Sequence, residues 1–134
     1  MNRCLRGFVS SAFLSLVSSV VLAYDIHITK ASEWSESAKS PVTEEQWKAA
    51  VLADGELKID DTASATNPKT KETIQIINPL MASWIDPKTK NKHYFYYSRG
   101  KITVKNPSDS AIKKMKFVAS KLGAKVQGDE GELY

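Results

Sequence analysis

The sequence predicts an α+β domain, an antiparallel sheet of about five to seven strands with two helices in the order β-α-β-β-β-β-β-α-β. Two stretches, at residues 44–53 and 107–122, carry apolar residues at helical spacing and have recognisable ends. Between them lie short segments rich in β-branched and aromatic residues, separated by turns that contain proline or glycine. Single strands before the first helix and after the second complete the order.

Residues 1–23 indicate a secretory signal rather than part of the fold. Arg3 and Arg6 give a basic start, residues 8–22 are apolar but interrupted by serines, and small or compact residues precede Tyr24. A membrane-spanning helix needs about 20 predominantly apolar residues, and this run is shorter. We therefore expect export to the periplasm with cleavage before Tyr24, which leaves one domain at residues 24–134 and no membrane attachment. Retention of the signal stays open as the alternative.

Removal of that segment changes the composition of the chain. The 134 residues become 111 (134 − 23), and the formal net charge falls from +4 to +2 because Arg3 and Arg6 are lost. The single cysteine, Cys4, is lost as well, so packing rather than disulfides must stabilise the domain in an oxidising compartment. A nearly neutral chain without a basic stripe gives no reason to expect nucleic acid as a partner.

The first strand and the first helix have clear local signals. Residues 24–29 alternate between apolar and polar side chains, as a half-buried strand does. Thr43 and Gln46 have the spacing of a capping box, which predicts a helix from Glu44 to about Ala53. Gly55 is placed to end that helix in the left-handed conformation.

Two similar turn sequences organise the middle of the chain. Residues 67–71 and 86–90 each read Asn or Asp, then Pro-Lys-Thr-Lys, and an Asx residue before proline is typical of a type I turn. Both are predicted to be hairpin loops. The strands they join are predicted at Glu56–Asp60 or slightly beyond, Glu72–Ile77, Leu80–Ile85, His93–Tyr97 and Lys101–Val104.

The lysines of these turns form the first candidate binding surface. In an up-and-down meander alternate loops lie at one end of the sheet, so Lys69, Lys71, Lys88 and Lys90 are expected to cluster there. Such a cluster attracts an acidic partner. The alternative is that the lysines only keep the hairpin ends soluble.

The last third of the chain predicts a strand, a capped helix and a second strand. Asn106 is predicted to cap the helix, with Pro107 at its first position and Gly123 at its left-handed end. Apolar residues line one face of this helix at spacings of three and four, whereas the lysines are expected to point elsewhere. The apolar positions are Ile112, Met115, Val118, Ala119 and Leu122, and the lysines are Lys113, Lys114, Lys116 and Lys121.

Aromatic and acidic residues supply the other candidate surfaces. On strand 93–97, Tyr94 and Tyr96 share one face, where they either pack beneath the connector that carries Trp34 or form an exposed patch for protein recognition. The tail carries three carboxylates, Asp129, Glu130 and Glu132. Their spacing does not match a calcium-binding loop, so they form either a solvated turn or a surface that docks onto a basic partner.

The sequence contains no recognised catalytic motif. His27 and His93 are its only histidines and are not at metal-ligand spacing. We predict no catalytic residues, no metal and no cofactor. The partner-binding candidates are therefore Lys69, Lys71, Lys88, Lys90, Tyr94, Tyr96, Asp129, Glu130 and Glu132.

Both ends of the domain resemble a family of small uncharacterised bacterial proteins. The resemblance rests on Tyr-Asp-Ile-His-Ile-Thr-Lys-Ala at residues 24–31 with Trp34, on Glu-Glu-Gln-Trp at 44–47, and on Lys-Asn-Pro at 105–107 with the closing segment 122–134. It implies a bacterial origin and one compact domain, and it brings no activity or site residues. Members of this family generally lack a signal peptide, so an exported form departs from their pattern.

A small, exported, cysteine-free domain without catalytic motifs favours a protein-binding role. The leading hypothesis is an immunity or inhibitor protein that neutralises a periplasm-acting bacterial toxin by stoichiometric binding. The alternative is a periplasmic accessory domain that binds a small ligand or a cell-wall component. A protruding or flat charged edge favours the first function, whereas a concave aromatic pocket favours the second. An enzyme is the third class, and a His–carboxylate pair is the feature that points to it.

Overall fold

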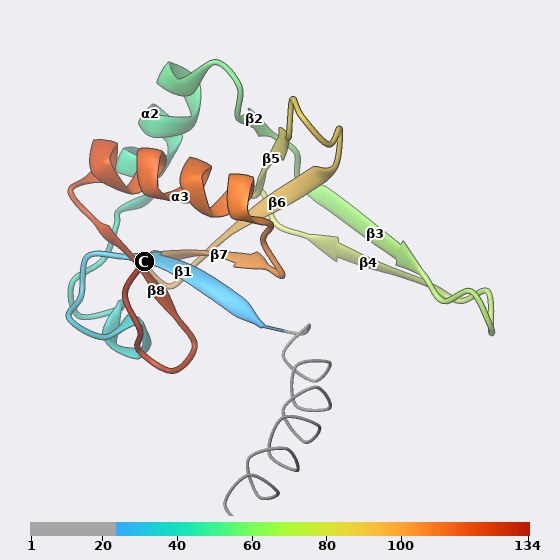
Figure 1. Cartoon of the computed structure of the whole chain (residues 1–134), viewed down its shortest axis with the longest axis horizontal. Coiled ribbons are helices and arrows are strands. Elements are labelled where there is room, and N and C mark those ends of the chain that lie inside the picture. The colour runs from blue at the N-terminus through green and yellow to red at the C-terminus, as the bar shows by residue number, and fades with distance from the viewer. Residues whose placement is uncertain (1–23) are drawn as a thin grey trace, which may run out of the picture.

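The computed structural model describes residues 24–134, and in that range it contains eight strands, two α-helices and one short 3-10 helix (Figure 1). The secretory signal predicted at residues 1–23 lies outside the described residues. The elements are β1 (Asp25–Thr29), η2 (Trp34–Glu36), α2 (Glu44–Asp54), β2 (Lys58–Ile59), β3 (Thr62–Thr66), β4 (Thr73–Ile77), β5 (Ala82–Ile85), β6 (Lys92–Ser98), β7 (Lys101–Lys105), α3 (Asp109–Leu122) and β8 (Lys125–Gly128). The predicted α+β class and order of elements are confirmed. The strand expected near 56–60 is divided in two, β2 and β3.

Six strands form the main sheet in the order β2-β5-β6-β7-β1-β8, and every neighbouring pair is antiparallel. Ile26 in β1 pairs with Val104 of β7 on one side and with Gly128 of β8 on the other. Because β7 and β8 are both antiparallel to β1, they are parallel to each other and are connected through α3. This arrangement is a split β-α-β unit whose middle strand is the N-terminal one.

Strands β3 and β4 form a separate two-stranded sheet that projects from the body (Figure 1). Ile59 pairs with Ala82 in the main sheet, and Thr62 pairs with Ile77 in the projecting sheet. Between these pairs, residues 60–61 on one chain segment lie opposite residues 78–81 on the other. The two sheets are therefore one long hairpin, bent at a bulge that contains a proline, which is a position where proline is tolerated.

The two repeated turns are hairpin loops, as predicted, and they share one geometry. Lys71 and Lys90 have positive φ angles of 64° and 66°, and each backbone N–H donates to the carbonyl oxygen of the first turn residue over 2.8 Å. The expected clustering of their lysines is wrong. Residues 78–81 bend the chain without reversing it, so the turns at 67–71 and 86–90 lie at opposite ends of the long hairpin (Figure 1).

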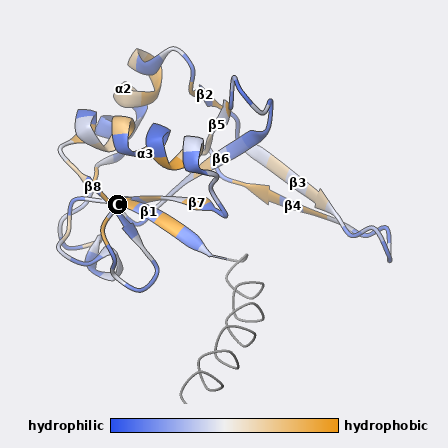
Figure 2. Cartoon of the chain, viewed as in Figure 1, coloured by the Kyte–Doolittle hydropathy of each residue, from blue (hydrophilic) through white to orange (hydrophobic). Residues whose placement is uncertain are grey.

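Both helices lie against one face of the main sheet (Figure 2), and apolar residues of β1 and β7 belong to the same buried core as those of the helices. The capping box of α2 is confirmed, since Thr43 Oγ1 accepts from Gln46 N–H and the Gln46 side chain accepts from Thr43 N–H. Gly55 ends this helix in the left-handed conformation, with φ of 81°. The core residues include Ile26, Ile28, Val42, Trp47, Val51, Trp84, Phe95, Ile102, Val104, Met115, Val118 and Val126.

The predicted cap of the second helix is wrong by two residues. The N-cap of α3 is Ser108, whose hydroxyl accepts from Ala111 N–H at 3.2 Å. Asn106 instead adopts a φ of 47°, and its side-chain oxygen accepts from Tyr24 N–H at 3.1 Å. The asparagine is used to hold the start of β1 beside the end of β7, so the helix begins after it. Gly123 ends α3 in the left-handed conformation as predicted.

Lys114 corrects the prediction that all the lysines of α3 point away from the core. Its side chain is 9% exposed, and its ammonium lies 2.8–2.9 Å from both carboxylate oxygens of Asp54 and 2.8 Å from Glu56. Burial alone would raise the pKa of Asp54, but hydrogen bonds from Lys114 and from the backbone N–H of Leu57 hold it below its ordinary value. This buried ion pair joins the end of α2 to the middle of α3.

The second face of the sheet is covered at one end only. Near β1 and β8, Thr29 Oγ1 bonds to Ser37 Oγ at 2.6 Å, and Trp34 N–H donates to Gln127 Oε1 at 2.6 Å. The segment after β1 therefore closes over that end together with the C-terminal turn. Farther along, the outward side chains of β6 and β7 are not covered by this segment, and that open region lies beside the base of the projecting sheet.

Candidate functional site: a projecting arm and a tyrosine-bearing sheet face

The β3–β4 hairpin, with its connecting turn, is called the arm here (residues 62–77). Cross-strand pairing places Ala63 beside Ile76 and Ala65 beside Ile74, so these four apolar side chains share one face. Ile74 is 66% exposed and Ile76 is 43% exposed. The opposite face of the arm carries threonine, serine and glutamine, with Ile77 as its one apolar member.

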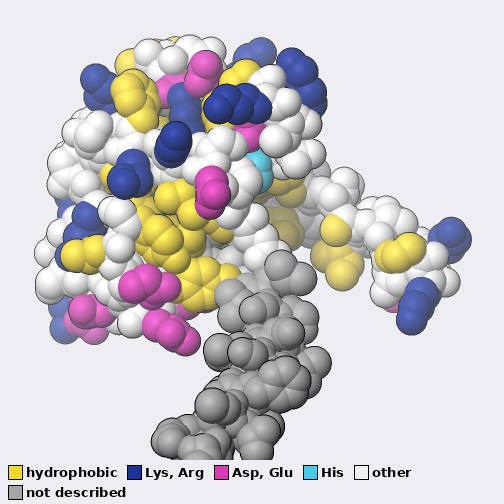
Figure 3. All heavy atoms as spheres, in the orientation of Figure 1, with side chains coloured by type: hydrophobic (Ala, Val, Ile, Leu, Met, Phe, Trp, Pro, Cys, Tyr) yellow, Lys and Arg dark blue, Asp and Glu magenta, His cyan; other side chains and the backbone are white. Residues whose placement is uncertain are grey.

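A projecting two-stranded arm adds little to the stability of an isolated domain. A two-stranded hairpin alone is marginally stable in water, because it buries little apolar surface. Here the isoleucines remain exposed along a segment that leaves the body, and both edges of the arm are free of strand partners within residues 24–134. Figure 3 shows hydrophobic side chains along the arm and basic groups at its far end. Exposed apolar surface of this kind is typical of interaction sites.

The apolar face of the arm continues onto the open part of the sheet. Tyr94 and Tyr96 of β6 and Thr103 and Lys105 of β7 make up this region, which we call the tyrosine face. Tyr96 is 38% exposed. Of the two predicted arrangements for these tyrosines, the exposed patch is the one observed, because Trp34 stacks on His27 instead, with ring centroids 4.2 Å apart.

A groove of about 490 Å³ lies between the arm and the tyrosine face. Its lining residues are Ala63, Ile76, Met81, Lys92, His93, Tyr94, Tyr96, Thr103 and Lys105. One wall is therefore apolar and the other is aromatic with basic ends. We call this space the arm groove.

Both signs of charge occur at this surface, but the lining of the arm groove itself holds two lysines and no carboxylate. Lys92 forms a salt bridge with Asp60 at 2.8 Å, and the hydrogen bond to Asp60 raises the pKa of Lys92 above its ordinary value. Lys105 borders the arm groove, and Lys69 and Lys71 lie at the tip of the arm. None of these last three lysines forms a salt bridge within residues 24–134. Glu72 lies in the same turn as Lys69 and Lys71, and Asp25 is opposite Lys105 in the sheet. The positive excess is therefore confined to the groove lining, where it favours an acidic partner.

The remaining predicted site residues are divided between other places. Lys88 and Lys90 are exposed in the turn between β5 and β6, away from the tip of the arm. Glu130 and Glu132 lie in the C-terminal turn, where Glu132 Oε1 accepts from Glu130 N–H at 3.1 Å. The structure thus brings only Tyr94 and Tyr96 together with the arm groove.

Asp129, although its side chain is 37% exposed, bonds to groups of the first strand. One carboxylate oxygen lies 2.8 Å from His27 Nε2, and the other accepts from Asp25 N–H at 3.2 Å. The other ring nitrogen of His27 lies 2.8 Å from Thr103 Oγ1, and the imidazole is only 3% exposed beneath the indole of Trp34. The spacing of these residues in the sequence gave no signal for this contact, because they come from two strands, the 3-10 helix and the C-terminal turn.

The chemistry available to this Thr–His–Asp array is limited. In the neutral ring, the carboxylate fixes the proton on Nε2, and Nδ1 then accepts from the Thr103 hydroxyl, which is the order found in hydrolytic triads. Acyl transfer also needs donors directed at a developing oxyanion. Thr103 lies in the middle of β7, which pairs with strands on both sides, so the ladder occupies this stretch of backbone. We interpret the array as a tie between the sheet and the C-terminal turn.

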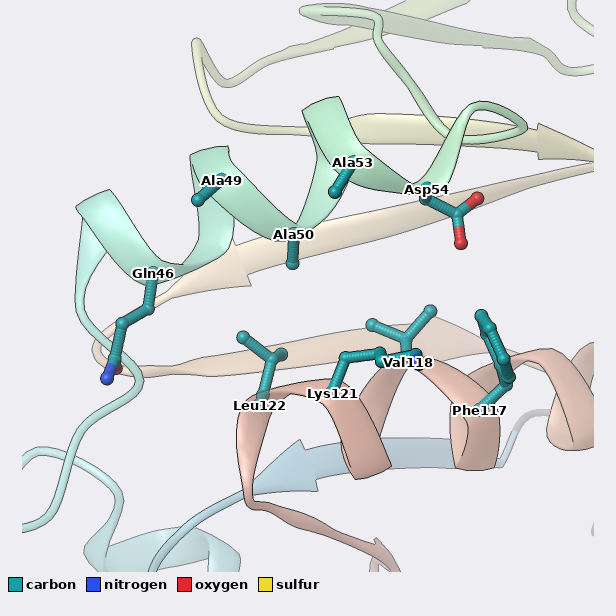
Figure 4. Close-up of a pocket in the computed structure, with 9 residues that line it drawn as sticks. All are labelled: Gln46, Ala49, Ala50, Ala53, Asp54, Phe117, Val118, Lys121 and Leu122. Carbon is teal, nitrogen blue, oxygen red and sulfur yellow. The ribbon is translucent and has the colours of Figure 1, made fainter.

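A second groove, of about 620 Å³, lies between the two helices (Figure 4). Ala49, Ala50 and Ala53 of α2 face Phe117 and Leu122 of α3 across it. Its width follows from the small side chains of α2, which leave space above the core. No cluster of charged groups lies at the centre of this groove. It therefore has a concave shape but few polar groups that could select a particular ligand.

The potential metal ligands of residues 24–134 are dispersed. Within this range no three His, Cys, Asp or Glu side chains gather closely enough to hold a metal ion. His93 lies against Trp84 on the helix-covered face and is not beside His27, and burial lowers its pKa. None of the helices in the described part of the chain has the length and apolar character needed to cross a membrane.

Comparison with known proteins adds no assignment. No protein-family model matches the chain, and neither the curated proteins nor the solved structures give a match.

Proposed function

We propose that this chain is an exported bacterial protein-binding domain that acts in the periplasm by stoichiometric binding. Its most specific form is an immunity or inhibitor protein that neutralises a periplasm-acting toxin by occupying a surface the toxin needs. The observation that carries the proposal is the arm, which exposes Ile74 and Ile76 on a projecting hairpin. Interface centres favour such apolar and aromatic anchors within polar surroundings.

The shape of the arm supports a protein partner over a small ligand. The arm groove has the volume of a ligand pocket and an aromatic wall, which is the specific observation in favour of the alternative, a ligand-binding or cell-wall-binding accessory domain. The exposed apolar surface, however, extends past the groove along the arm to Ile74. A small ligand in the groove would leave that extension uncovered, whereas a protein surface covers both.

The same proposal holds that the chain is not an enzyme. His27 and Asp129 satisfy the criterion of a His–carboxylate pair, and Thr103 stands where a hydrolytic triad has its nucleophile. Acyl transfer also needs hydrogen-bond donors for an oxyanion, and the backbone around Thr103 is engaged in the sheet on both sides. We therefore propose a binding protein and not an enzyme.

The test is capture of a partner followed by measurement of stoichiometry and inhibition. The protein is purified in the form that accumulates in the cells that express it, and it is used as bait. It is offered two samples: periplasmic extract, and the products of neighbouring reading frames, which are expressed as catalytically dead variants. A one-to-one complex with a toxin-like enzyme, whose active form loses activity on binding, supports the proposal. Retention of a small molecule or glycan, with no protein partner, contradicts it and supports the accessory-domain alternative.

A further inference from the structure

The arm groove has features that select one kind of occupant. Its arm wall is formed by Ala63 and Ile76, and its sheet wall by Tyr94 and Tyr96, so the centre is suited to apolar side chains. Lys92 and Lys105 also line the groove, and Lys92 is paired with Asp60. An occupant therefore meets apolar contacts from both walls and one lysine, Lys105, that forms no salt bridge within residues 24–134.

We infer that the arm groove binds an extended, acidic polypeptide segment of the partner, with apolar side chains that insert between Ile76 and Tyr96. This inference rests on the proposed function and names the element of the partner that is recognised. An extended chain directs alternate side chains to opposite sides. It therefore presents apolar anchors to the groove at alternate positions, while a carboxylate beside them reaches Lys105.

The geometry of the arm supports a polypeptide strand over other occupants. The arm leaves the edges of β3 and β4 unpaired, so backbone N–H and C=O groups are available for a strand to add. A second copy of this chain would bring the same lysines to the same groove, which like-charge repulsion disfavours. An anionic membrane matches the charge, but a flat surface reaches the arm tip and not a groove recessed between two walls.

The experiment selects random displayed 12-residue peptides on the intact protein. The expected result is enrichment of peptides with net negative charge and apolar residues at alternate positions. Binding of a selected peptide is then measured by fluorescence anisotropy. Ile76→Asp is expected to weaken it by about tenfold or more, as loss of a central anchor does, and Ile77→Asp on the outer face of the arm is the matched control. Enrichment of basic peptides or of none, or equal binding to both variants, overturns the inference.

A second variant keeps the test valid if Ile76→Asp disturbs the arm. Lys105→Glu changes an exposed residue of β7, outside the arm, and is expected to weaken an acidic peptide about tenfold and to reduce the salt dependence of binding. Unchanged affinity contradicts the inference. Co-sedimentation with phosphatidylglycerol vesicles tests the membrane alternative. If the protein co-sediments and Ile76→Asp and Lys105→Glu reduce this equally, the occupant is a lipid surface and the peptide inference is overturned.

Failure of this inference is distinguishable from failure of the proposed function. If an intact partner forms a one-to-one complex that tolerates Ile76→Asp and Lys105→Glu, the chain is a protein-binding domain that uses another surface. If no protein partner is captured at all, the proposed function is contradicted. A positive peptide result then shows only that the groove binds peptides.

Discussion

Replacing Lys114 with methionine is expected to destabilise the domain by about 3–5 kcal/mol, the usual cost of breaking a buried ion pair by removing one partner. The Asp54 side chain is 4% exposed, and Lys114 supplies hydrogen bonds of 2.8 and 2.9 Å to its two oxygens. Methionine fills a similar volume, so the loss comes from the stranded carboxylate and not from a cavity. Glu56 is 60% exposed and contributes at most about 1 kcal/mol of the total.

The measurement is urea unfolding followed by tryptophan fluorescence. Trp84 is a suitable reporter because its ring centroid lies 5.9 Å from the Lys114 ammonium. Since domains of this size have total stabilities of about 5–15 kcal/mol, the predicted loss removes a large part of the total. In thermal unfolding the same change corresponds to roughly 12–20 °C, at roughly 4 °C per kcal/mol.

Two further variants decide whether the ion pair is responsible. Lys116→Met changes an exposed lysine of the same helix and is expected to alter stability by no more than about 0.5 kcal/mol. Asp54→Asn combined with Lys114→Met removes the stranded charge and should recover much of the loss, because an amide oxygen still accepts from the backbone N–H groups after α2. If Lys114→Met costs no more than Lys116→Met, the reasoning about this buried pair is refuted.

Three other predictions concern the turn, the backbone and pH. Asp129→Ala leaves a buried imidazole N–H without its acceptor and should cost about 1–3 kcal/mol, whereas Glu130→Ala in the same turn should be near neutral; equal effects in urea unfolding would contradict the tie. Gly100→Ala should cost about 2 kcal/mol or more, because φ is +82° and a Cβ there would lie 2.9 Å from a backbone oxygen; an unchanged Tm would refute this strain. The pKa of Asp54 is held below its ordinary value of 3.8, so its contribution to stability is present above that pH and is lost as pH falls through the lowered value. In Lys114→Met, burial raises that pKa instead, so the stability difference from wild type should shrink between pH 6 and pH 3, and a constant difference in unfolding free energy across that range would be the contrary result.

Local signals in the sequence predicted the elements of the fold. The alternation of residues 24–29, the capping box at Thr43 and the glycines at 55 and 123 each act through neighbours in the chain, and all are confirmed. Asn106 failed as a cap because its side chain bonds to Tyr24, which is far away in the sequence. A capping residue is predictable only when no distant group competes for it.

The features of the candidate site depend on long-range geometry and were predicted less well. The lysines were expected to cluster because the predicted strands were taken as an up-and-down meander, whereas the bulge at residues 78–81 continues the chain in the same direction. Lys114 was assigned to the solvent because its type is usually exposed, and only the position of Asp54 on the other helix reveals its partner. Tyr94 and Tyr96 were correctly recognised as a shared face, because strand alternation is a local property.

The central position of β1 has a consequence for how the chain folds. His27 meets Thr103, which follows 76 positions later, and Asp129, which follows 102 positions later, so the first strand acquires neighbours only from the end of the polypeptide. Contacts between residues so far apart in the sequence require a large loss of loop-closure entropy before they stabilise the fold, and this slows folding. The nascent chain therefore lacks a complete sheet until residues 125–128 have been synthesised. For the export proposed above, this late closure would keep the chain unfolded while it passes through a narrow channel.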